Sequence, residues 1–260
     1  MELKGRAIKI LLTLIGIAGF VFIFGIHEVQ ITEDFKYVGP VPNPFQNIAS
    51  QIIRIIINDM VPEGVLPIVT KPGEAIFSAL FVAIFVGILF GMPVIAYELG
   101  AFVSPGLYPK ERSMVLKLIA PISLLFAGGV IFAYVFVIRI ALDFLYRFAL
   151  GVEAQTFIAI PELISFVLLF LIAFGASFQL PVIMWFLTYV GIVEPKFWKD
   201  NIRMAIVGIV IFGAVITPDG SGITMWLVAA PMFILYGVGY LFIRRLKARP
   251  LEEETEIERE

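Results

Sequence analysis

Two long uncharged segments constrain the fold of this chain more than any other feature of its sequence. Residues 75–97 and residues 118–138 contain no Asp, Glu, Lys or Arg. At about 1.5 Å per residue in a helix, each segment is long enough to cross a hydrocarbon core of roughly 30 Å. Residues 102–112 join them and contain two prolines and a glycine, so this stretch is expected to form a polar hinge at one membrane surface.

Four more apolar segments bring the expected number of transmembrane helices to six. They are residues 10–26, 163–193, 204–218 and 223–243. The 163–193 segment is too long for one upright span, which predicts a tilted helix that bends or breaks near Pro181. The 204–218 segment is short for a full bilayer, and residues 139–162 are expected to be a mixed loop. The first segment lacks a small-residue cleavage site and is interpreted as a retained span.

Composition agrees with a polytopic membrane protein and excludes several function classes. Hydrophobic residues make up 60% of the chain and charged residues 15%, against about 25% charged residues in soluble domains. The chain has no cysteine, which excludes disulfides and thiol catalysis. The single histidine, His27, is expected to be an interfacial residue, and no enzyme activity, metal or cofactor is expected. The net charge of −2 gives no reason to expect nucleic-acid binding.

The distribution of Lys and Arg predicts the orientation in the membrane. With the N-terminus in the cytoplasm, fourteen of the 19 Lys and Arg residues lie on the cytoplasmic side. The positive-inside rule therefore predicts that both termini are cytoplasmic. Residues 1–243 are expected to form a single membrane domain, and residues 244–260 a charged, disordered cytoplasmic tail.

The polar segment 27–74 forms the first extracytoplasmic loop in this topology. Six prolines make much of it extended or turning, but isoleucines recur at helical spacing over residues 48–60. This pattern favours a short amphipathic helix lying on the bundle. A strand rich in β-branched residues is the alternative.

Three polar residues of the apolar regions have both a structural and a functional interpretation. Gln179 either holds helices together beside Pro181 or lines a cavity that a substrate enters. Asp219, after Pro218 in an extracytoplasmic turn, either caps the sixth helix or has a role of its own. Glu111 either pairs with its charged neighbours in water or receives a cationic ligand.

Several motifs together resemble the TatC family, the multispanning core of the twin-arginine protein translocase. Residues 102–112, FVSPGLYPKER, resemble the family pattern F-x-x-P-A/G-L-Y-x-x-E-R/K. Upstream, MPVIAY at residues 92–97 resembles A-P-V-I-L-Y. Further on, FGASFQLP at residues 174–181 resembles F-G-x-x-F-E-x-P, and ITPD at residues 216–219 resembles the T-P-x-D turn. The proline and tyrosine of the sixth span, Pro231 and Tyr236, also fit the family pattern.

The resemblance implies a concave, glove-shaped bundle of six helices that binds twin-arginine signal peptides. Glu111, together with Glu2, would supply carboxylates for the arginine pair, and Phe102 and Leu107 would contact the apolar part of the peptide. Lys4 falls on the first arginine of the family's opening motif, whose leading His-Leu is absent here. Gln179 replaces the glutamate that is usual in the family.

The resemblance also implies a cellular setting for the chain. It would be a multi-pass protein of the cytoplasmic membrane that helps to transport folded proteins with energy from the proton-motive force. Its partners would be single-span subunits of the TatA and TatB type, twin-arginine precursors, membrane lipid and further copies of the chain. A small-solute secondary transporter and a scaffold without transport activity remain as alternatives, although no internal repeat supports a transporter.

Overall fold

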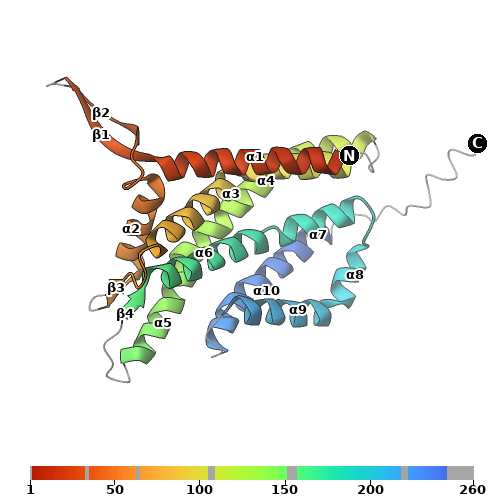
Figure 1. Ribbon diagram of the computed structural model, residues 1–260. Helices are drawn as coiled ribbons and strands as arrows, with labels where there is room; N and C mark the ends of the chain where they lie inside the picture. Colours follow the sequence, from red (N-terminus) through yellow and green to blue (C-terminus); the bar gives the residue numbers. More distant parts are fainter. Residues whose placement is uncertain are drawn as a thin grey trace, which may run out of the picture.

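The computed structural model describes residues 2–32, 35–62, 65–104, 109–150, 157–217 and 222–244 (Figure 1). The side chains of residues 2, 28–32, 35–37, 109–114 and 148–150 are not described. Of the predicted site residues, Leu107, Pro218 and Asp219 lie outside the described ranges.

Five apolar helical segments of the described chain are long enough to cross a membrane. They contain α1 (Glu2–Ile23), α3 (Glu74–Val103), α4 (Pro109–Phe132), α6 (Ile160–Ser177) with α7 (Leu180–Tyr189), and α10 (Ile223–Ile243). A further apolar helix, α9 (Ile202–Ile216), has 15 residues and is shorter than these. The predicted helical bundle is therefore confirmed, and α9 is the short helix that the sequence leads us to expect.

The helix that follows the hinge is longer than predicted. After α4 the chain forms a π-helix, η2 (Ala133–Val137), and then α5 (Ile138–Leu150). The mixed loop expected over residues 139–162 is thus wrong for its first half. Charged residues in this part lie on the exposed side of α5, where Nε of Arg147 is 2.8 Å from a carboxylate oxygen of Asp143 one turn earlier.

The long apolar segment around Pro181 is broken, as predicted. The break between α6 and α7 falls at Phe178 and Gln179, two residues before the proline. Pro181 occupies an early position in α7, where a missing N–H costs no helical hydrogen bond. The helix is consequently interrupted at Phe178 and Gln179 and not at the proline itself.

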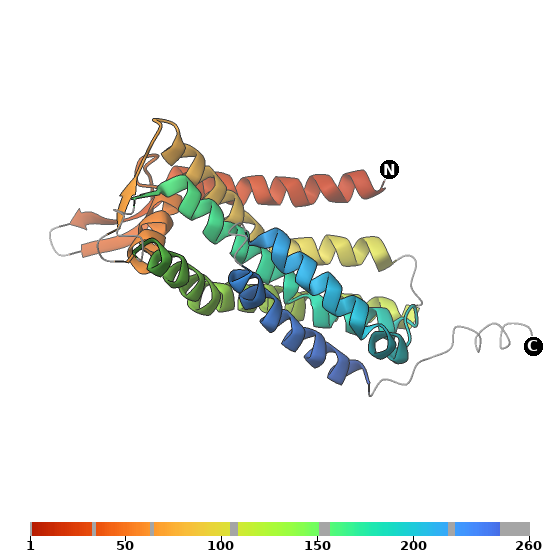
Figure 2. The same ribbon diagram turned by 90° about the horizontal axis from the view of Figure 1, so that it is seen from below.

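One end of the bundle carries the four strands of the described chain and is called here the hairpin face. Strands β1 (Phe24–Thr32) and β2 (Phe35–Pro42) form an antiparallel hairpin, and β3 (Leu66–Ile68) pairs in parallel with β4 (Phe157–Ala159). The sequence prediction of an all-α protein holds for the apolar bundle but misses these strands. Figures 1 and 2 show the hairpin projecting beyond the end of α1.

The amphipathic helix predicted over residues 48–60 is confirmed as α2 (Ile48–Met60). Its N-cap, Asn47, is 1% exposed, accepts a hydrogen bond from the Ser50 amide and donates one to the Phe22 carbonyl. At the other end of α2, the Tyr134 hydroxyl donates to Asp59 over 2.8 Å. These bonds tie α2 to α1 on one side and to η2 on the other.

Glycines allow close packing where helices cross. A Cβ added at Gly87 of α3 would lie 3.0 Å from the Leu14 carbonyl oxygen of α1, and one at Gly91 would lie 2.8 Å from the Leu14 side chain. Spaced four residues apart, the two glycines form a flat strip that receives α1. Gly129 of α4 faces Phe174 of α6 in the same way, because an added Cβ would lie 2.6 Å from its carbonyl oxygen.

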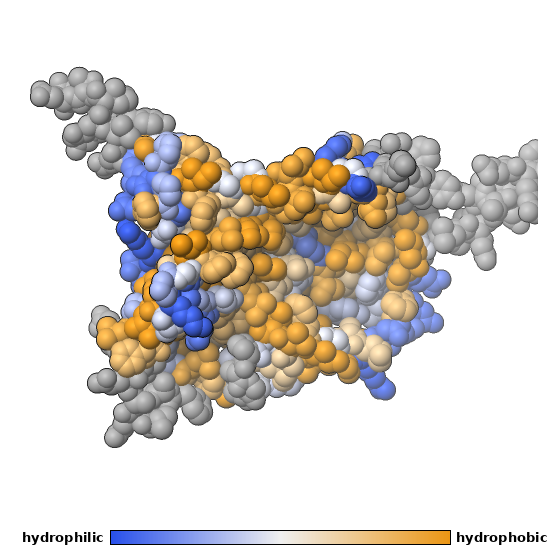
Figure 3. All heavy atoms as spheres, in the orientation of Figure 1, coloured by the Kyte–Doolittle hydropathy of each residue, from blue (hydrophilic) through white to orange (hydrophobic). Residues whose placement is uncertain are grey.

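The end of the bundle opposite the hairpin face is called the amino-terminal face. There α1 begins, α3 ends, α4 begins, and the short helix α8 (Pro195–Asp200) connects α7 to α9. The start of α1 and the end of α10 both lie at this face (Figure 2). Hydrophilic residues gather at the two ends of the molecule and a hydrophobic band separates them, as expected for a bundle that crosses a bilayer (Figure 3).

The sixth apolar helix begins later than the capping interpretation of Asp219 requires. The N-cap of α10 is Gly222, whose φ of 74° lies in the left-handed region. Glycine adopts this conformation without the steric cost that a Cβ would add. The capping interpretation, one of the two given for Asp219, is therefore wrong, and the other stays a prediction because Asp219 lies outside the described residues.

Candidate functional site

The hinge between α3 and α4 is shorter than its sequence indicates. The predicted hinge began at Phe102, but α3 continues to Val103 and α4 already starts at Pro109. Proline is favourable at the first position of a helix, where its missing N–H has no partner to lose. Phe102 consequently lies in the last turn of α3, and Glu111 lies in the first turn of α4.

The predicted ligand-binding residues that the structure describes lie in helix ends at the amino-terminal face. Glu2 is the first residue of α1, and Lys4 follows it with an exposed side chain. Phe102 is 46% exposed at the end of α3. The side chains of Glu2 and Glu111 are not among those described, so their contacts stay a prediction.

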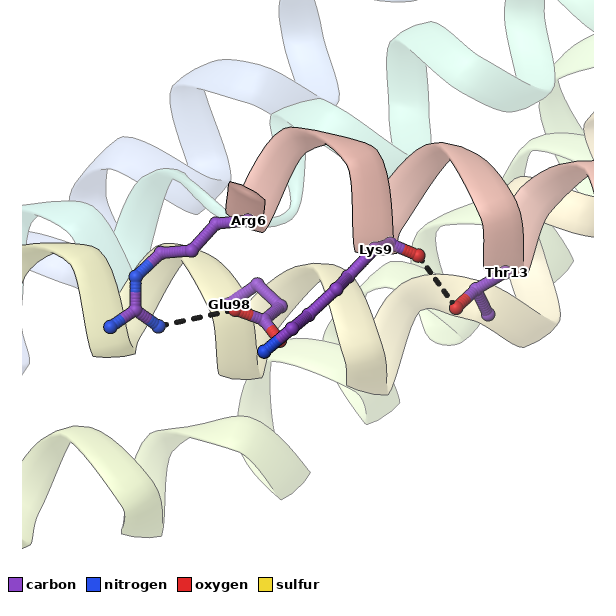
Figure 4. Close-up of polar contacts among 4 residues, drawn as sticks. All are labelled: Arg6, Lys9, Thr13 and Glu98. Carbon is purple, nitrogen blue, oxygen red and sulfur yellow. Dashed lines mark hydrogen bonds and ion pairs between the residues drawn. The ribbon is translucent and has the colours of Figure 1, made fainter. Parts of the chain in front are cut away.

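A buried carboxylate at this face was missed by the sequence analysis. Glu98 of α3 is 4% exposed, and its Oε2 accepts a hydrogen bond of 3.1 Å from Nη1 of Arg6 in α1. Its Oε1 lies 3.5 Å from Nζ of Lys9, one turn further along α1. Figure 4 shows both cationic side chains reaching from α1 to the same carboxylate. Glu98, Arg6 and Lys9 are called here the ionic cluster.

The ionic cluster had a signal in the sequence. Glu98 directly follows an uncharged segment of 23 residues, residues 75–97, and a helix that continued beyond this segment would carry it at the membrane surface. Arg6 and Lys9 are three residues apart, a spacing that places both on one side of a helix. The segment was interpreted as ending at residue 97, so the carboxylate was not considered part of the helix.

An apolar groove of about 290 Å³ lies on the other side of α3. Its walls come from the last turns of α3, the first turns of α4 and from α7, and include Ala96, Val115 and Phe186. The side chain of Gln179 also lines it, at the break between α6 and α7. The groove therefore runs beside the hinge, and Gln179 is the one strongly polar residue among its described lining residues.

Gln179 joins helices as well as lining the groove. Its amide nitrogen donates a hydrogen bond of 3.0 Å to the Ile122 carbonyl of α4 and a longer one of 3.4 Å to the Gly175 carbonyl of α6. The amide oxygen is buried, and no hydrogen-bond partner for it lies among the described residues. Both interpretations of Gln179 thus have a structural basis: it connects helices, and it lines a cavity.

The loop formed by α8 is fixed to the bundle. The indole N–H of Trp198 donates to the Thr188 hydroxyl of α7 over 3.0 Å. The Tyr236 hydroxyl of α10 donates to the Trp198 carbonyl over 2.6 Å. These two bonds hold the second loop of the amino-terminal face against α7 and α10.

Comparison with known proteins gives a consistent result over almost the whole chain. The family model for the Sec-independent protein translocase protein (TatC) matches residues 1–231. The TatC protein of Cenarchaeum symbiosum is 43% identical over 244 residues, which cover 94% of this chain and 92% of the relative. The TatC protein of Escherichia coli K12 is 33% identical over 201 residues and 77% of each chain.

Solved structures agree with the architecture. A crystal structure of the twin arginine translocase receptor TatC superposes with a TM-score of 0.73 at 28% identity, covering 94% of this chain and 96% of the other. The same receptor crystallised in DDM gives a TM-score of 0.76 at 26% identity, with 93% and 97% covered. The expected TatC-like arrangement of helices is therefore confirmed, and this chain belongs to the TatC family of Sec-independent protein translocase proteins.

Proposed function

We propose that this chain is the receptor subunit of a twin-arginine translocase and binds the signal peptides of folded precursor proteins at its amino-terminal face. The observation that carries this proposal is the position of Glu111 in the first turn of α4, beside an apolar groove. A signal peptide offers the complementary features, since it combines a pair of arginines with an apolar segment.

A carboxylate can bind an arginine of the peptide only if it is exposed and not covered by another protein chain. A guanidinium group binds a carboxylate through two parallel N–H···O bonds, which a lysine ammonium cannot reproduce. In this proposal Glu111 and Glu2 receive the arginine pair, while Phe102 and Leu107 contact the apolar segment. The groove lined by Ala96, Val115 and Gln179 offers further apolar surface for it.

The proposal includes the setting in which the receptor works. The amino-terminal face is cytoplasmic, both termini lie in the cytoplasm, and the hairpin face lies outside the cytoplasmic membrane. Single-span partners of the TatA and TatB type complete the translocase, and the proton-motive force drives transport. The chain itself carries out no chemical conversion. Membership of the TatC family favours this function over small-solute secondary transport.

Binding of a synthetic twin-arginine signal peptide to the purified protein tests this function. Glu111→Gln keeps the size of the side chain and removes its charge, so binding should weaken tenfold or more if a charge-assisted bond of about 1.5–3 kcal/mol is lost. Arg112→Gln, the matched control on the next residue, should change affinity by less than about threefold. A peptide with a twin-lysine pair should bind wild type more weakly. Equal binding of both peptides would contradict the proposed function.

A further inference from the structure

The apolar groove beside the hinge has walls that follow single faces of helices. Its lining residues recur every three or four positions along α3 and α4, and include Met92, Ala96, Leu99 and Val103 of α3 with Val115 and Leu118 of α4. This spacing is that of one helical face. From Met92 to Val103 the chain advances eleven residues, so the α3 wall extends about 16 Å at 1.5 Å per residue.

The groove has a buried floor and an exposed apolar rim. On the floor, Ala96 is 5% exposed and Val115 is 6% exposed. On the rim, the exposed fractions are 55% for Leu99 of α3 and 51% for Ile183 of α7. A Cβ added at Gly100 would overlap the Val115 side chain, so a glycine is needed here for α3 and α4 to meet at the floor. The rim thus offers apolar surface that the chain itself leaves uncovered.

The size of the groove limits what it can take from a peptide. Its volume is about 290 Å³, whereas a helix with its side chains has a diameter of about 10–12 Å. The groove is therefore too small to enclose a helix over its whole length, but it can receive the side chains of one helical face. No charged residue is among its described lining residues, so this face has to be apolar.

The position of the groove connects it with the site proposed for the arginine pair. Its α3 wall ends at Val103, the last residue of α3, and Val115 of its α4 wall follows Glu111 by four residues. An apolar segment that directly follows a bound arginine pair is held at this entrance, which raises its effective concentration in the groove. The acyl chain of a lipid has no such attachment.

We propose that the apolar segment of the signal peptide binds this groove as a helix of about three turns, the length of the α3 wall. The inference rests on the proposed function and deepens it. The helix enters at the hinge, next to the arginine pair, and runs inward towards Gln179. It places apolar side chains in the groove at every third or fourth position, and its other side chains stay outside. The groove thus selects for the position of apolar residues as well as for their number.

A positional scan of the peptide tests this mode of binding. In a series of synthetic twin-arginine peptides, each residue of an all-leucine apolar segment is replaced in turn by alanine. All members of the series have the same composition, so their partition into detergent is equal and only position can change affinity. Binding to the purified protein should weaken about tenfold at positions three or four residues apart and less than about twofold between them.

Two neighbouring residues of α4 provide a matched pair of protein variants. Val115→Phe places a larger side chain on the floor of the groove, so binding of the all-leucine peptide should weaken about tenfold and the dependence on position should disappear. Leu116→Phe adds the same ring to a side chain that is 54% exposed and is not among the lining residues, and it should bind like wild type. Thermal unfolding in detergent shows whether Val115→Phe folds. Ile183→Ala at the exposed rim does not disturb the floor and should weaken binding about threefold.

Three results would overturn the inference. Sensitivity at every second residue would show an extended peptide, and equal sensitivity at all positions would show that only total hydrophobicity matters. A helical pattern that persists unchanged in Val115→Phe and Ile183→Ala would place the peptide outside the groove. Each of these results leaves the proposed function standing if wild type still prefers the twin-arginine to the twin-lysine peptide. Equal binding of those two peptides would instead contradict the proposed function itself.

Discussion

The side-chain amide of Gln179 donates a hydrogen bond of 3.0 Å to the backbone carbonyl of Ile122 in the neighbouring helix. The bond connects α4 to the point where the α6–α7 segment breaks. Since the same side chain lines the apolar groove, a change at this position acts on the packing of the bundle and on the polarity of the groove together.

Replacing Gln179 by leucine should lower both stability and transport. Leucine removes the donor to Ile122, and we expect a loss of about 1–3 kcal/mol in the free energy of unfolding. Gln179→Glu should be tolerated, because a carboxyl group in an apolar site keeps its proton and can donate the same bond. Thermal unfolding in detergent and transport of a twin-arginine precursor measure the two effects. Full transport by Gln179→Leu would show that no polar group is needed in the groove.

Adjacent glycines in α4 provide a matched pair for the contact with α6. A Cβ at Gly129 would lie 2.6 Å from the Phe174 carbonyl oxygen and 2.9 Å from the Phe178 ring, whereas one at Gly128 would meet no atom within 4 Å. Gly129→Ala should therefore cost about 1–3 kcal/mol of stability. Gly128→Ala should be neutral or stabilising, because alanine favours a helix by about 1 kcal/mol over glycine. Equal melting temperatures for both variants would contradict the close packing of α4 on α6.

Removal of the Tyr134 hydroxyl should loosen α2. The hydroxyl donates to Asp59 over 2.8 Å, and Tyr134→Phe removes this bond while it keeps the ring. Because Asp59 is exposed, we expect a loss of only about 1 kcal/mol. Hydrogen exchange of the α2 amides should become faster, while Tyr97→Phe on the exposed surface of α3 serves as the control. Unchanged exchange in Tyr134→Phe would show that other contacts suffice to hold α2.

The orientation in the membrane can be tested with single cysteines, since the natural chain has none. A cysteine at Lys199, exposed on α8, should react only with reagents applied from the cytoplasm. A cysteine at Val38, 60% exposed on β2, should react from outside. This pattern follows from the positive-inside rule. Labelling of the Lys199 position from outside would require the reverse orientation.

The helices were predictable where charge and length alone define a span. Residues 223–243 match α10 at both ends, because a turn and a basic tail flank the apolar segment. The continuation into α5 was not predictable from uncharged segments, because Arg139 and Asp143 interrupt the apolar pattern without interrupting the helix. The β1–β2 hairpin was missed because Pro40 and Pro42 pointed to irregular structure, whereas two paired strands tolerate proline at their edges.

The sequence predicted those site residues that belong to family motifs. Gln179 was identified from its isolation in an uncharged segment, and the structure gives it both the contacts of a helix connector and a place in the groove. Glu98 was missed because a single charge at the end of a span usually meets water or lipid headgroups. Only the approach of Arg6 and Lys9 from another helix gives it a role, and that contact depends on tertiary packing between distant parts of the chain.

The length of α9 has an electrical consequence for the membrane around it. At about 1.5 Å per residue, its 15 residues extend about 22 Å, against roughly 30 Å for a typical hydrocarbon core. Met204 and Val215, near its two ends, are 71% and 75% exposed, so the chain leaves this helix open to its surroundings along its length. Lipid that adapts to such a short helix becomes thinner. In the expected six-span topology, the membrane voltage would therefore fall over a shorter distance beside α9, and the electric field there would be steeper than in the surrounding bilayer.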